Sequence, residues 1–510
     1  MPKITLISTD ESIASMGIRT ISSNLIKHGF DTAIVIMADY KDSYNEFQLD
    51  ALLDVCRGSL FIGISSMTHG IKKAIEIKKI LKKNFINIPI VIGGIHSTLN
   101  PESLLENFDF ICLGEGEDLV VDLAKCLVSN MSPVNIPGLW CRSNSVIFKN
   151  SPIPLRMDLN DYPMPDYVLD HHYIFESGKI VSMELGHINC DYFPVMGSRG
   201  CPHECTYCSN HRIKEKYPWR KKVRQYSINY LIKHLSNLCR IYPTIKSFWL
   251  EDDTFFAKDI NQIIQFADRY KEEVRKPFNI LVSPWTYSEE KVRILVNAGM
   301  DRLIFGIQSG SENTNINIYN RSISNARLFS IINSLNSFKE LLPFYDFIGM
   351  NPFETREDLV NSIKFIRQIP TPFFLFSNNL AFYPGTKISE RAIKLGIDIS
   401  RRDRHTDAKH GYAILKNEKI KHKLFHLILL LMGGRADKIR IGGIPRIFIS
   451  NVALKMFCYL EKKHSWSVDK FAVILSLILA RIDLKDFLKK HLNHKQIQNL
   501  KKAYSFIKIK

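Results

Sequence analysis

The stretch Gly200-Cys201-Pro202-His203-Glu204-Cys205-Thr206-Tyr207-Cys208 decides how this sequence is interpreted. It places three cysteines at the spacing CxxxCxxC, directly after the apolar run 193–196. Three thiolates on one short loop can hold three irons of a [4Fe-4S] cluster and leave the fourth iron open for a ligand. Zinc is the alternative, but a structural zinc site normally has four ligands, and no second cysteine pair lies nearby. Cys190 could serve as a fourth ligand, although it precedes the predicted strand.

This loop resembles the signature of the radical S-adenosylmethionine (SAM) superfamily, in which the residue before the third cysteine is usually aromatic, as Tyr207 is here. In that family, the open iron binds the amino and carboxylate groups of SAM, and one-electron reduction cleaves SAM to a 5'-deoxyadenosyl radical. The resemblance implies that Cys201, Cys205 and Cys208 are the cluster ligands and that Tyr207 lies against the adenine of SAM. It also implies an external electron donor such as a flavodoxin or ferredoxin.

The length and composition of the chain restrict the class of protein to which it can belong. A chain of 510 residues is long enough for about three domains. Ten cysteines without an N-terminal signal pattern favour the reducing cytoplasm over a disulfide framework. No apolar run reaches the roughly 18 to 20 residues that a transmembrane helix needs. The net charge of +18 suggests an anionic partner, such as nucleic acid, a phosphorylated substrate or a membrane surface, or else only a lysine-rich proteome.

The first 130 residues alternate short apolar runs with amphipathic ones. Strands are expected at 4–8, 32–37, 60–65, 89–92 and 108–113, with helices between them at 18–28, 71–83 and 119–128. This order predicts an α/β domain with a doubly wound parallel sheet. Such sheets bind ligands beyond the carboxyl ends of their strands. The small and polar residues at those ends are Ser65, Ser66, Thr68, Gly93, Gly94, His96, Gly114, Glu115 and Gly116.

This domain resembles the cobalamin-binding domain that precedes the radical SAM domain in one broad branch of the superfamily. The resemblance implies that the residues at the strand ends contact cobalamin. The DxHxxG motif, whose His ligates cobalt in other cobalamin proteins, is absent, because Thr9-Asp10-Glu11-Ser12-Ile13 follows the first strand. Many members of this branch lack that motif, so its absence points to cobalt without a protein His ligand. A domain kept only for packing or dimerisation is the alternative.

Residues 131–192 are expected to form a linker, because prolines punctuate them and only a small hairpin of 139–141 with 146–149 is indicated. The segment Leu159-Asn160-Asp161-Tyr162-Pro163 resembles the linker common to this branch. Its expected role is to fix the distance between the two cofactors.

From 193 to 390 the alternation resumes, with strands expected at 193–198, 247–250, 279–282, 302–306, 344–349 and 373–380. Six such units fit the open (βα)6 barrel of radical SAM enzymes, and parallel barrels carry their chemistry at the carboxyl-terminal face. Carboxylates after the second strand could hold the ammonium group of SAM, although Asp253-Thr254 could equally cap a helix. By resemblance to motifs of the family, the SAM contacts are Tyr207, Glu251, Asp252, Gln308, Ser309, Glu312 and Arg321.

The last region, 391–510, carries no family motif and is expected to be mainly helical. Residues 401–405 form a basic patch, and 424–432 and 471–482 are apolar stretches of the length of core helices. With the lysines that flank them, these stretches could instead lie on a membrane surface or cover an apolar substrate.

Taken together, the resemblance implies an enzyme that cleaves SAM reductively and methylates an unactivated carbon with the help of cobalamin. A radical reaction without methylation, such as cyclisation, rearrangement, epimerisation or dehydration, is the alternative. A corrinoid or iron-sulfur sensor that does not turn over SAM is a more remote one. The substrate is expected to be a small molecule, a lipid or a peptide. RNA would suit the positive charge, but the sequence has no compact RNA-binding module.

Overall fold

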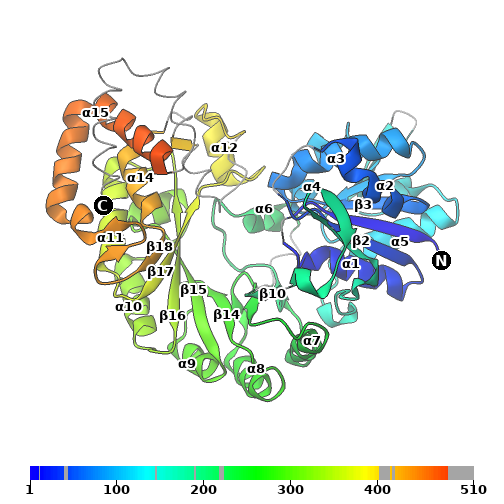
Figure 1. The fold of residues 1–510 in the computed structure, drawn as a ribbon, viewed down its shortest axis with the longest axis horizontal. Helices are drawn as coiled ribbons and strands as arrows, with labels where there is room; N and C mark the ends of the chain where they lie inside the picture. Colours follow the sequence, from blue (N-terminus) through cyan, green and yellow to red (C-terminus); the bar gives the residue numbers. More distant parts are fainter. Residues whose placement is uncertain are drawn as a thin grey trace.

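The structure is a computed structural model that describes residues 1–10, 12–39, 44–143, 146–188, 191–217, 223–400, 414–415 and 420–479. Cys190, the basic patch 401–405 and the end of the expected helix 471–482 lie outside the described residues. Two large sheets organise the described part, one in the N-terminal half and one in the rest (Figure 1).

The N-terminal sheet has the strand order β7-β6-β5-β4-β3-β1-β2-β8-β9. Its five central strands are parallel: β1 (Lys3–Ser8), β2 (Asp31–Ile36), β3 (Ser59–Ser65), β4 (Ile90–Gly93) and β5 (Phe110–Cys112). Alternate residues of β1 enter different cores, since Ile4 and Leu6 pack in one hydrophobic cluster and Ile7 in another. A sheet with apolar side chains on both faces needs a helical layer on each, which is the doubly wound arrangement expected from the sequence.

Helices supply those two layers. One layer consists of α1 (Met16–Lys27) and α5 (Glu117–Val128), which contact each other, and the other of α2 (Asp50–Cys56) and α3 (Ile71–Asn84). The short α4 (Ile95–Leu99) follows β4 directly and reaches toward the second half of the molecule, where it contacts α6 (Ser209–Lys216).

Residues 131–192, expected as a linker, also build both edges of the N-terminal sheet. The predicted hairpin forms as β6 (Leu139–Ser143) and β7 (Val146–Lys149), and β6 pairs antiparallel with β5. On the other edge, β8 (His172–Glu176) pairs parallel with β2 and antiparallel with β9 (Lys179–Ser182). Pairing of these strands covers the edges that the central five strands would otherwise expose.

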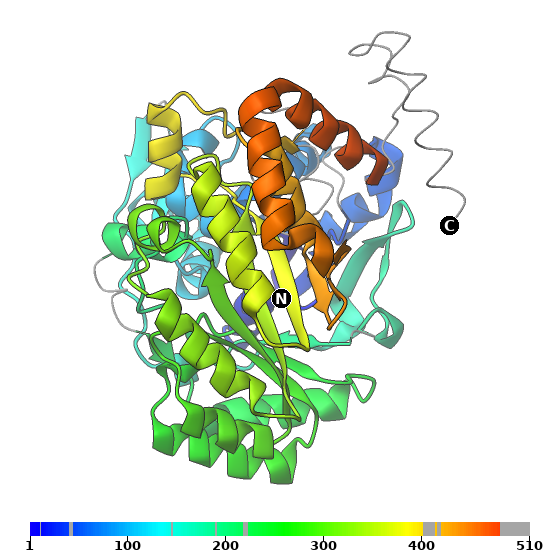
Figure 2. The ribbon, with the colours of Figure 1, turned by 90° about the vertical axis from the view of Figure 1, so that its left-hand side faces the viewer.

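The second sheet begins with six parallel strands in chain order, which is the order expected for an open (βα)6 barrel. They are β10 (Phe193–Val195), β13 (Phe248–Leu250), β14 (Phe278–Val282), β15 (Met300–Gln308), β16 (Leu342–Gly349) and β17 (Phe373–Asn379). The helices that connect them lie on the outside of the curved sheet (Figure 2): α7 (Ile228–Ile241), α8 (Ile260–Glu273), α9 (Glu289–Asn297), α10 (Asn325–Asn336) and α11 (Arg356–Gln368).

The first barrel strand ends earlier than expected, and the chain then enters a separate two-stranded ribbon. Its strands are β11 (Ser198–Arg199) and β12 (Arg224–Gln225), which pair antiparallel. The cysteine loop and α6 lie between them in the sequence. The ribbon therefore carries the cysteine loop at the point where the chain leaves the barrel sheet.

The C-terminal region contributes strands as well as helices. After α12 (Lys387–Lys394), the chain forms α14 (Lys423–Leu431), whose mainly apolar sequence is buried against α11 and α15 (Asn451–Leu479). The short strands β18 (Gly434–Ala436), β19 (Arg440–Ile441) and β20 (Ile444–Pro445) extend the barrel sheet beyond β17. Among the described helices, none combines the length and the apolarity needed to span a bilayer.

Candidate active site

Cys201, Cys205 and Cys208 lie on one loop between β11 and α6. The loop begins at Gly200, whose φ of 101° side chains rarely adopt. It closes where the amide of Cys208 donates to the carbonyl of Cys205 at 3.1 Å, immediately before α6. Cys205 is buried, and the other two thiols are half-buried.

Several hydrogen bonds fix the backbone of this loop. The amide and the hydroxyl of Thr206 donate to the carbonyls of Tyr319 and Ile318, at 3.1 Å and 2.6 Å. From α6, Lys214 Nζ donates to the carbonyl of His203 at 2.6 Å. The loop is therefore anchored both to the segment that follows β15 and to the helix that follows the loop itself.

The thiols fit a polynuclear cluster. Burial raises the pKa of Cys201 and of Cys208 to about 12, so each is a thiol in the metal-free chain, and iron must displace its proton. Within the part of the chain that the structure describes, no three His, Cys, Asp or Glu side chains lie close enough to hold one metal ion. A [4Fe-4S] cluster needs no such convergence, because each thiolate ligates a different iron.

Arg321 lies beside the cysteine loop and is buried. Its Nη1 is 3.6 Å from Cys205 Sγ and 3.3 Å from the hydroxyl of Tyr207, and its Nη2 donates to the carbonyl of Gly306 at 2.7 Å. Its Nε is a buried donor without a partner among the described residues. A buried cation with an unused donor is suited to an anionic group, such as the SAM carboxylate that the family resemblance implies as its partner.

Several aromatic side chains lie close to the guanidinium of Arg321 or to its neighbours. The guanidinium of Arg321 lies 4.8 Å from the ring centroid of Trp285, and the ring of His203 lies 4.6 Å from the same indole. Tyr207 contacts Tyr319 edge-on at 5.1 Å. Trp285 was not predicted as a site residue, although it follows the end of β14 and strand ends are where site residues were expected.

The two carboxylates after β13 have different surroundings. Asp252 is fully buried, with Lys258 Nζ and the amide of Gly197 each 2.5 Å from its oxygens. Its charge is thus already neutralised by the protein. Glu251 is half-buried, and burial raises the pKa of its carboxyl to about 7. Of the pair, Glu251 is the one with a carboxylate left to meet a ligand.

The three predicted residues at the end of β15 and just after it also have different surroundings. Gln308 is half-buried at the end of the strand, with a φ of 66°. Ser309 is buried with its hydroxyl 3.1 Å from that of Ser362 in α11. Glu312 Oε1 accepts a hydrogen bond from the amide of Asn325 at the start of α10, at 2.5 Å. Ser309 and Glu312 therefore contact α10, α11 and the loop before α11, whereas Gln308 ends the strand.

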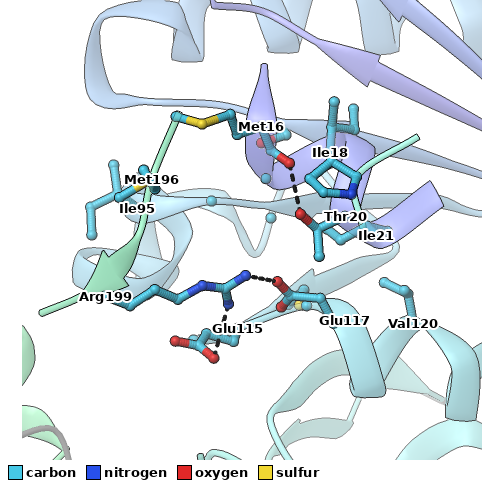
Figure 3. Close-up of a pocket in the computed structure, with 18 of the residues that line it drawn as sticks. Met16, Ile18, Thr20, Ile21, Ile95, Glu115, Glu117, Val120, Met196 and Arg199 are labelled. Carbon is cyan, nitrogen blue, oxygen red and sulfur yellow. Dashed lines mark hydrogen bonds and ion pairs between the residues drawn. The ribbon is translucent and has the colours of Figure 1, made fainter. Parts of the chain in front are cut away.

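A cavity of about 480 Å³ lies between the N-terminal sheet and the barrel. From the N-terminal side, the predicted residues that line it are Ser65, Gly93, Gly94, Gly114, Glu115 and Gly116. Figure 3 shows Met196 and Arg199, from the barrel side, facing Met16, Ile95 and Glu117. The cavity lies at the carboxyl ends of the parallel strands, where doubly wound sheets bind ligands.

Three predicted residues, Ser66, Thr68 and His96, are not among those that line this cavity. The hydroxyl of Ser66 accepts a hydrogen bond from Thr9 at 2.8 Å, and its backbone carbonyl packs under Gly94. His96 is buried, with its ring nitrogens 3.3 Å from the hydroxyls of Thr68 and Ser103. Burial lowers the pKa of His96 to about 4, so its ring is neutral near pH 7. Ser66, Thr68 and His96 therefore support the loops that form the cavity floor.

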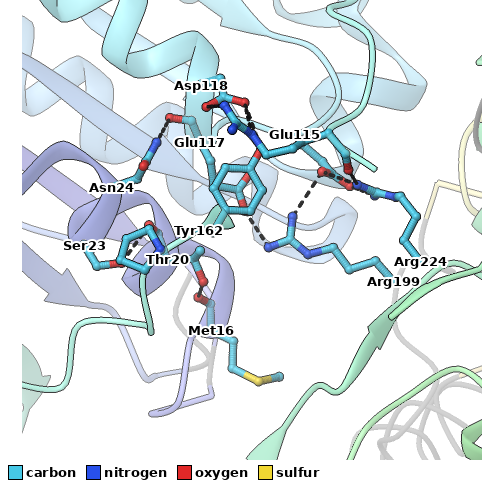
Figure 4. A network of polar contacts seen from close by, with 12 residues as sticks. Met16, Thr20, Ser23, Asn24, Glu115, Glu117, Asp118, Tyr162, Arg199 and Arg224 are labelled. Atoms are coloured by element: carbon cyan, nitrogen blue, oxygen red, sulfur yellow. Dashed lines mark hydrogen bonds and ion pairs between the residues drawn. The ribbon is translucent and has the colours of Figure 1, made fainter. Parts of the chain in front are cut away.

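One wall of the cavity is a cluster of charged residues (Figure 4). Arg199 Nη2 and Glu117 Oε1 are 2.6 Å apart, and Arg199 Nη1 and Glu115 Oε2 are 3.2 Å apart. Arg224 makes a two-pronged contact with the same Glu115 carboxylate. Neither arginine was predicted as a site residue, although Arg199 directly precedes the Gly-Cys start of the cysteine loop.

Comparisons with known proteins identify both halves. Residues 195–366 match the radical SAM superfamily, and residues 2–124 match the B12 binding domain. An uncharacterized methyltransferase of Pyrococcus horikoshii is 27% identical over 339 residues, which cover 65% of this chain and 69% of that protein. An anaerobic magnesium-protoporphyrin IX monomethyl ester cyclase of Synechocystis sp. is 24% identical, over 60% of this chain and 58% of the cyclase.

A solved structure shares the fold over almost the whole chain. The cobalamin-dependent SAM radical enzyme OxsB, with aqua-cobalamin bound, superposes with a TM-score of 0.62 at 17% identity, covering 96% of this chain and 76% of OxsB. The cofactors of these two domains are a [4Fe-4S] cluster with SAM and cobalamin, as expected from the sequence. The chain therefore carries a radical SAM domain over residues 195–366 and a B12-binding domain over residues 2–124.

Proposed function

We propose that this enzyme transfers a methyl group from SAM to an unactivated carbon of its substrate. The observation that carries the proposal is the cavity shared by both domains, with the corrinoid side formed by the ends of β3, β4 and β5 and the opposite side by residues next to the cysteine loop. A substrate carbon must reach both cofactors, and a shared cavity at their junction meets that requirement.

In this proposal Cys201, Cys205 and Cys208 hold the [4Fe-4S] cluster, and Arg321 pairs with the carboxylate of SAM. Glu251 faces the ammonium group of SAM, because Asp252 is already paired with Lys258. Tyr207 lies against the adenine. Cobalamin, when bound, supplies the methyl carrier, and the chain's own part is to position the ligands and to exclude water.

The electron balance requires an outside reductant. With the cluster and SAM bound, one electron from a donor of the flavodoxin or ferredoxin class would cleave the S–C5' bond of SAM, giving methionine and a 5'-deoxyadenosyl radical that takes a hydrogen atom from the substrate. A second SAM would provide the methyl group at the oxidation level of a methyl cation and leave as S-adenosylhomocysteine. Joining that methyl group to the substrate radical therefore requires a second electron from the donor. Such chemistry suits the reducing cytoplasm that the ten cysteines predict.

A radical reaction without methylation is the second candidate, and the likeness to a protein named as a cyclase favours it. The substrate of either reaction stays open among small molecules, lipids and peptides. Nucleic acid and a peripheral membrane contact rest only on the net charge and the lysine-flanked apolar C-terminal stretches.

The products of SAM distinguish the candidates. The reconstituted chain would be incubated anaerobically with SAM and a chemical reductant, with and without added hydroxocobalamin, and 5'-deoxyadenosine and S-adenosylhomocysteine would be quantified. A methyltransferase yields both products, and the second depends on cobalamin. A non-methylating enzyme yields 5'-deoxyadenosine alone, and a sensor yields neither product.

A further inference from the structure

Four charged side chains join the N-terminal sheet to the cysteine loop, and all of them are largely removed from solvent. Glu115 and Glu117 lie at the junction of β5 and α5, and Arg199 and Arg224 lie on the two-stranded ribbon β11–β12. The side-chain exposures are 19% for Arg199, 11% for Glu115, and 4% for both Glu117 and Arg224. Ion pairs at such depth are little screened by salt, so they hold over a wide range of ionic strength.

The register of the ribbon brings the two arginines together. Arg199 and Arg224 are direct partners in the antiparallel pair, and both guanidiniums reach the carboxylate of Glu115. Arg224 Nη1 also donates to the carbonyl of Arg156 at 2.7 Å. One carboxylate of the N-terminal domain is thus held between both strands of the ribbon, and one of those strands is also tied to the connecting segment.

The charged residues on both sides of this cluster are next to loops that are proposed to hold the two cofactors. Arg199 is followed by Gly200 and the first cluster cysteine, Cys201. Glu115 lies between Gly114 and Gly116, which line the cavity, and the carbonyl of Glu117 accepts a hydrogen bond from Asn24 of α1 at 2.8 Å. A displacement of any of these charged groups would therefore be passed to the cysteine loop or to the cavity floor.

We propose that Arg199, Arg224, Glu115 and Glu117 form an interdomain clamp that sets the distance between the cluster and the corrinoid. The clamp rests on the proposed two-cofactor function and deepens it, because its members are positioning residues that touch neither reacting carbon nor metal. Radical and methyl transfer need the substrate carbon placed against both cofactors, and a misplacement of about 1 Å can cost about 100-fold in rate.

Two variants and a matched control test the clamp. Arg199→Met removes the guanidinium but keeps an unbranched apolar stem. Glu117→Gln keeps an acceptor for Arg199 but removes the charge, which guards against a failure of the first variant to fold. Arg156→Met is the control, because Arg156 belongs to the same region but is 41% exposed and pairs with Asp118, outside the clamp. All proteins are reconstituted with iron, sulfide and hydroxocobalamin.

The readout is the distance between two unpaired spins. The reduced cluster and the Co(II) form of cobalamin are both paramagnetic, so pulsed dipolar EPR of the reduced holoenzyme measures their separation. Arg199→Met is expected to retain both cofactors, while its distance distribution shifts and broadens. Glu117→Gln should show a smaller change of the same kind, and Arg156→Met should match the wild type.

Unchanged distributions in Arg199→Met and Glu117→Gln would overturn the clamp. Loss of corrinoid from both variants, with retention in Arg156→Met, would also overturn it, because these side chains would then be ligands of the corrinoid. If the wild-type chain itself retained no corrinoid, the proposed function would fail before any variant was measured, and there would be no second cofactor for the clamp to position.

Discussion

Glu354 lies in the loop between β16 and α11, and its buried carboxyl group contacts the segment that follows β15. Its Oε1 accepts hydrogen bonds from Thr314 and Ser309 at 3.2 Å and 3.4 Å, whereas its buried Oε2 has no partner among the described residues. Burial, together with the negative charge of Asp358, raises the pKa of Glu354 from 4.5 to about 8. The folded chain therefore keeps this proton over a pH range in which the unfolded chain has lost it.

The raised pKa of Glu354 makes the stability of the folded chain depend on pH. The folded state binds the extra proton between about pH 4.5 and 8, so the free energy of unfolding falls as pH rises through that window, by up to about 1.4 kcal/mol per pH unit for this group. Glu354→Gln removes the titration. Urea unfolding of the metal-free chain at pH 6 and pH 8 should show a smaller loss of stability in the variant than in the wild type.

Glu357→Gln provides the control for this measurement, since Glu357 is an exposed carboxylate three residues further along. It should keep the wild-type pH dependence. Equal losses of stability in the wild type and in Glu354→Gln would show that Glu354 is ionised in the folded chain, contrary to its burial.

At the same scale, the sequence could indicate where polar residues gather but not what each one contacts. Glu251 and Asp252 follow the same strand, and the strand pattern alone gave them one role. In the structure, adjacent positions meet different surroundings, and Asp252 is paired with Lys258, six residues away. That pair depends on the loop after β13, whose shape the sequence pattern does not specify.

The turn between β4 and α4 shapes the side of the cavity that is proposed to hold the corrinoid. Gly94 has a φ of 101° and a ψ of −171°, a region that is essentially restricted to glycine. A Cβ at this position would lie 2.6 Å from the backbone carbonyl oxygen of Ser66. Because that oxygen belongs to the backbone of the neighbouring loop, it cannot rotate away as a side chain could.

Gly94→Ala should therefore destabilise the N-terminal domain and weaken corrinoid retention. The backbone conformation alone costs about 1 to 3 kcal/mol, and the contact with Ser66 adds to it. Gly29→Ala is the matched control, since Gly29 has a φ of 84° and nothing within 4 Å of its Cβ position. It should cost only about 1 kcal/mol.

The urea midpoint measures the loss of stability, and the corrinoid that remains after desalting measures the loss of corrinoid retention. A Gly94→Ala variant that is as stable as Gly29→Ala and retains the wild-type amount of corrinoid would contradict this account of the turn.

The central elements could be predicted from the sequence because their apolar periodicity is strong. Expected strands at 4–8 and 344–349 correspond to β1 and β16, within a few residues at each end. The strands β8 and β9 were not expected, because they are short and lie in a proline-punctuated segment. Their place at the edge of the sheet comes from tertiary pairing with β2, which leaves no local signal.

At the scale of the whole molecule, the cavity and the clamp are properties of two domains placed against each other. The motifs of each domain could be predicted separately, and with them the α/β fold class and the cofactors. The contact of Arg199 with Glu117 joins residues 82 positions apart, and no local pattern in the sequence pairs them. Such a contact can be identified only from a structure that contains both domains.

The most direct test of the account is the cofactor content of one chain. The protein would be reconstituted anaerobically with iron, sulfide and hydroxocobalamin and then desalted. Its visible spectrum, iron, corrinoid and 5'-deoxyadenosine production with SAM would then be measured, beside a Cys208→Ser variant and a Cys239→Ser control that alters a half-buried cysteine on α7.

The account predicts about four irons and about one corrinoid per wild-type chain, with reductive cleavage of SAM. Cys208→Ser should lose the cluster and the cleavage but keep the corrinoid, and Cys239→Ser should behave as the wild type. A wild-type chain that holds a cluster and cleaves SAM but retains no corrinoid would contradict the central claim that one cavity brings the two cofactors together.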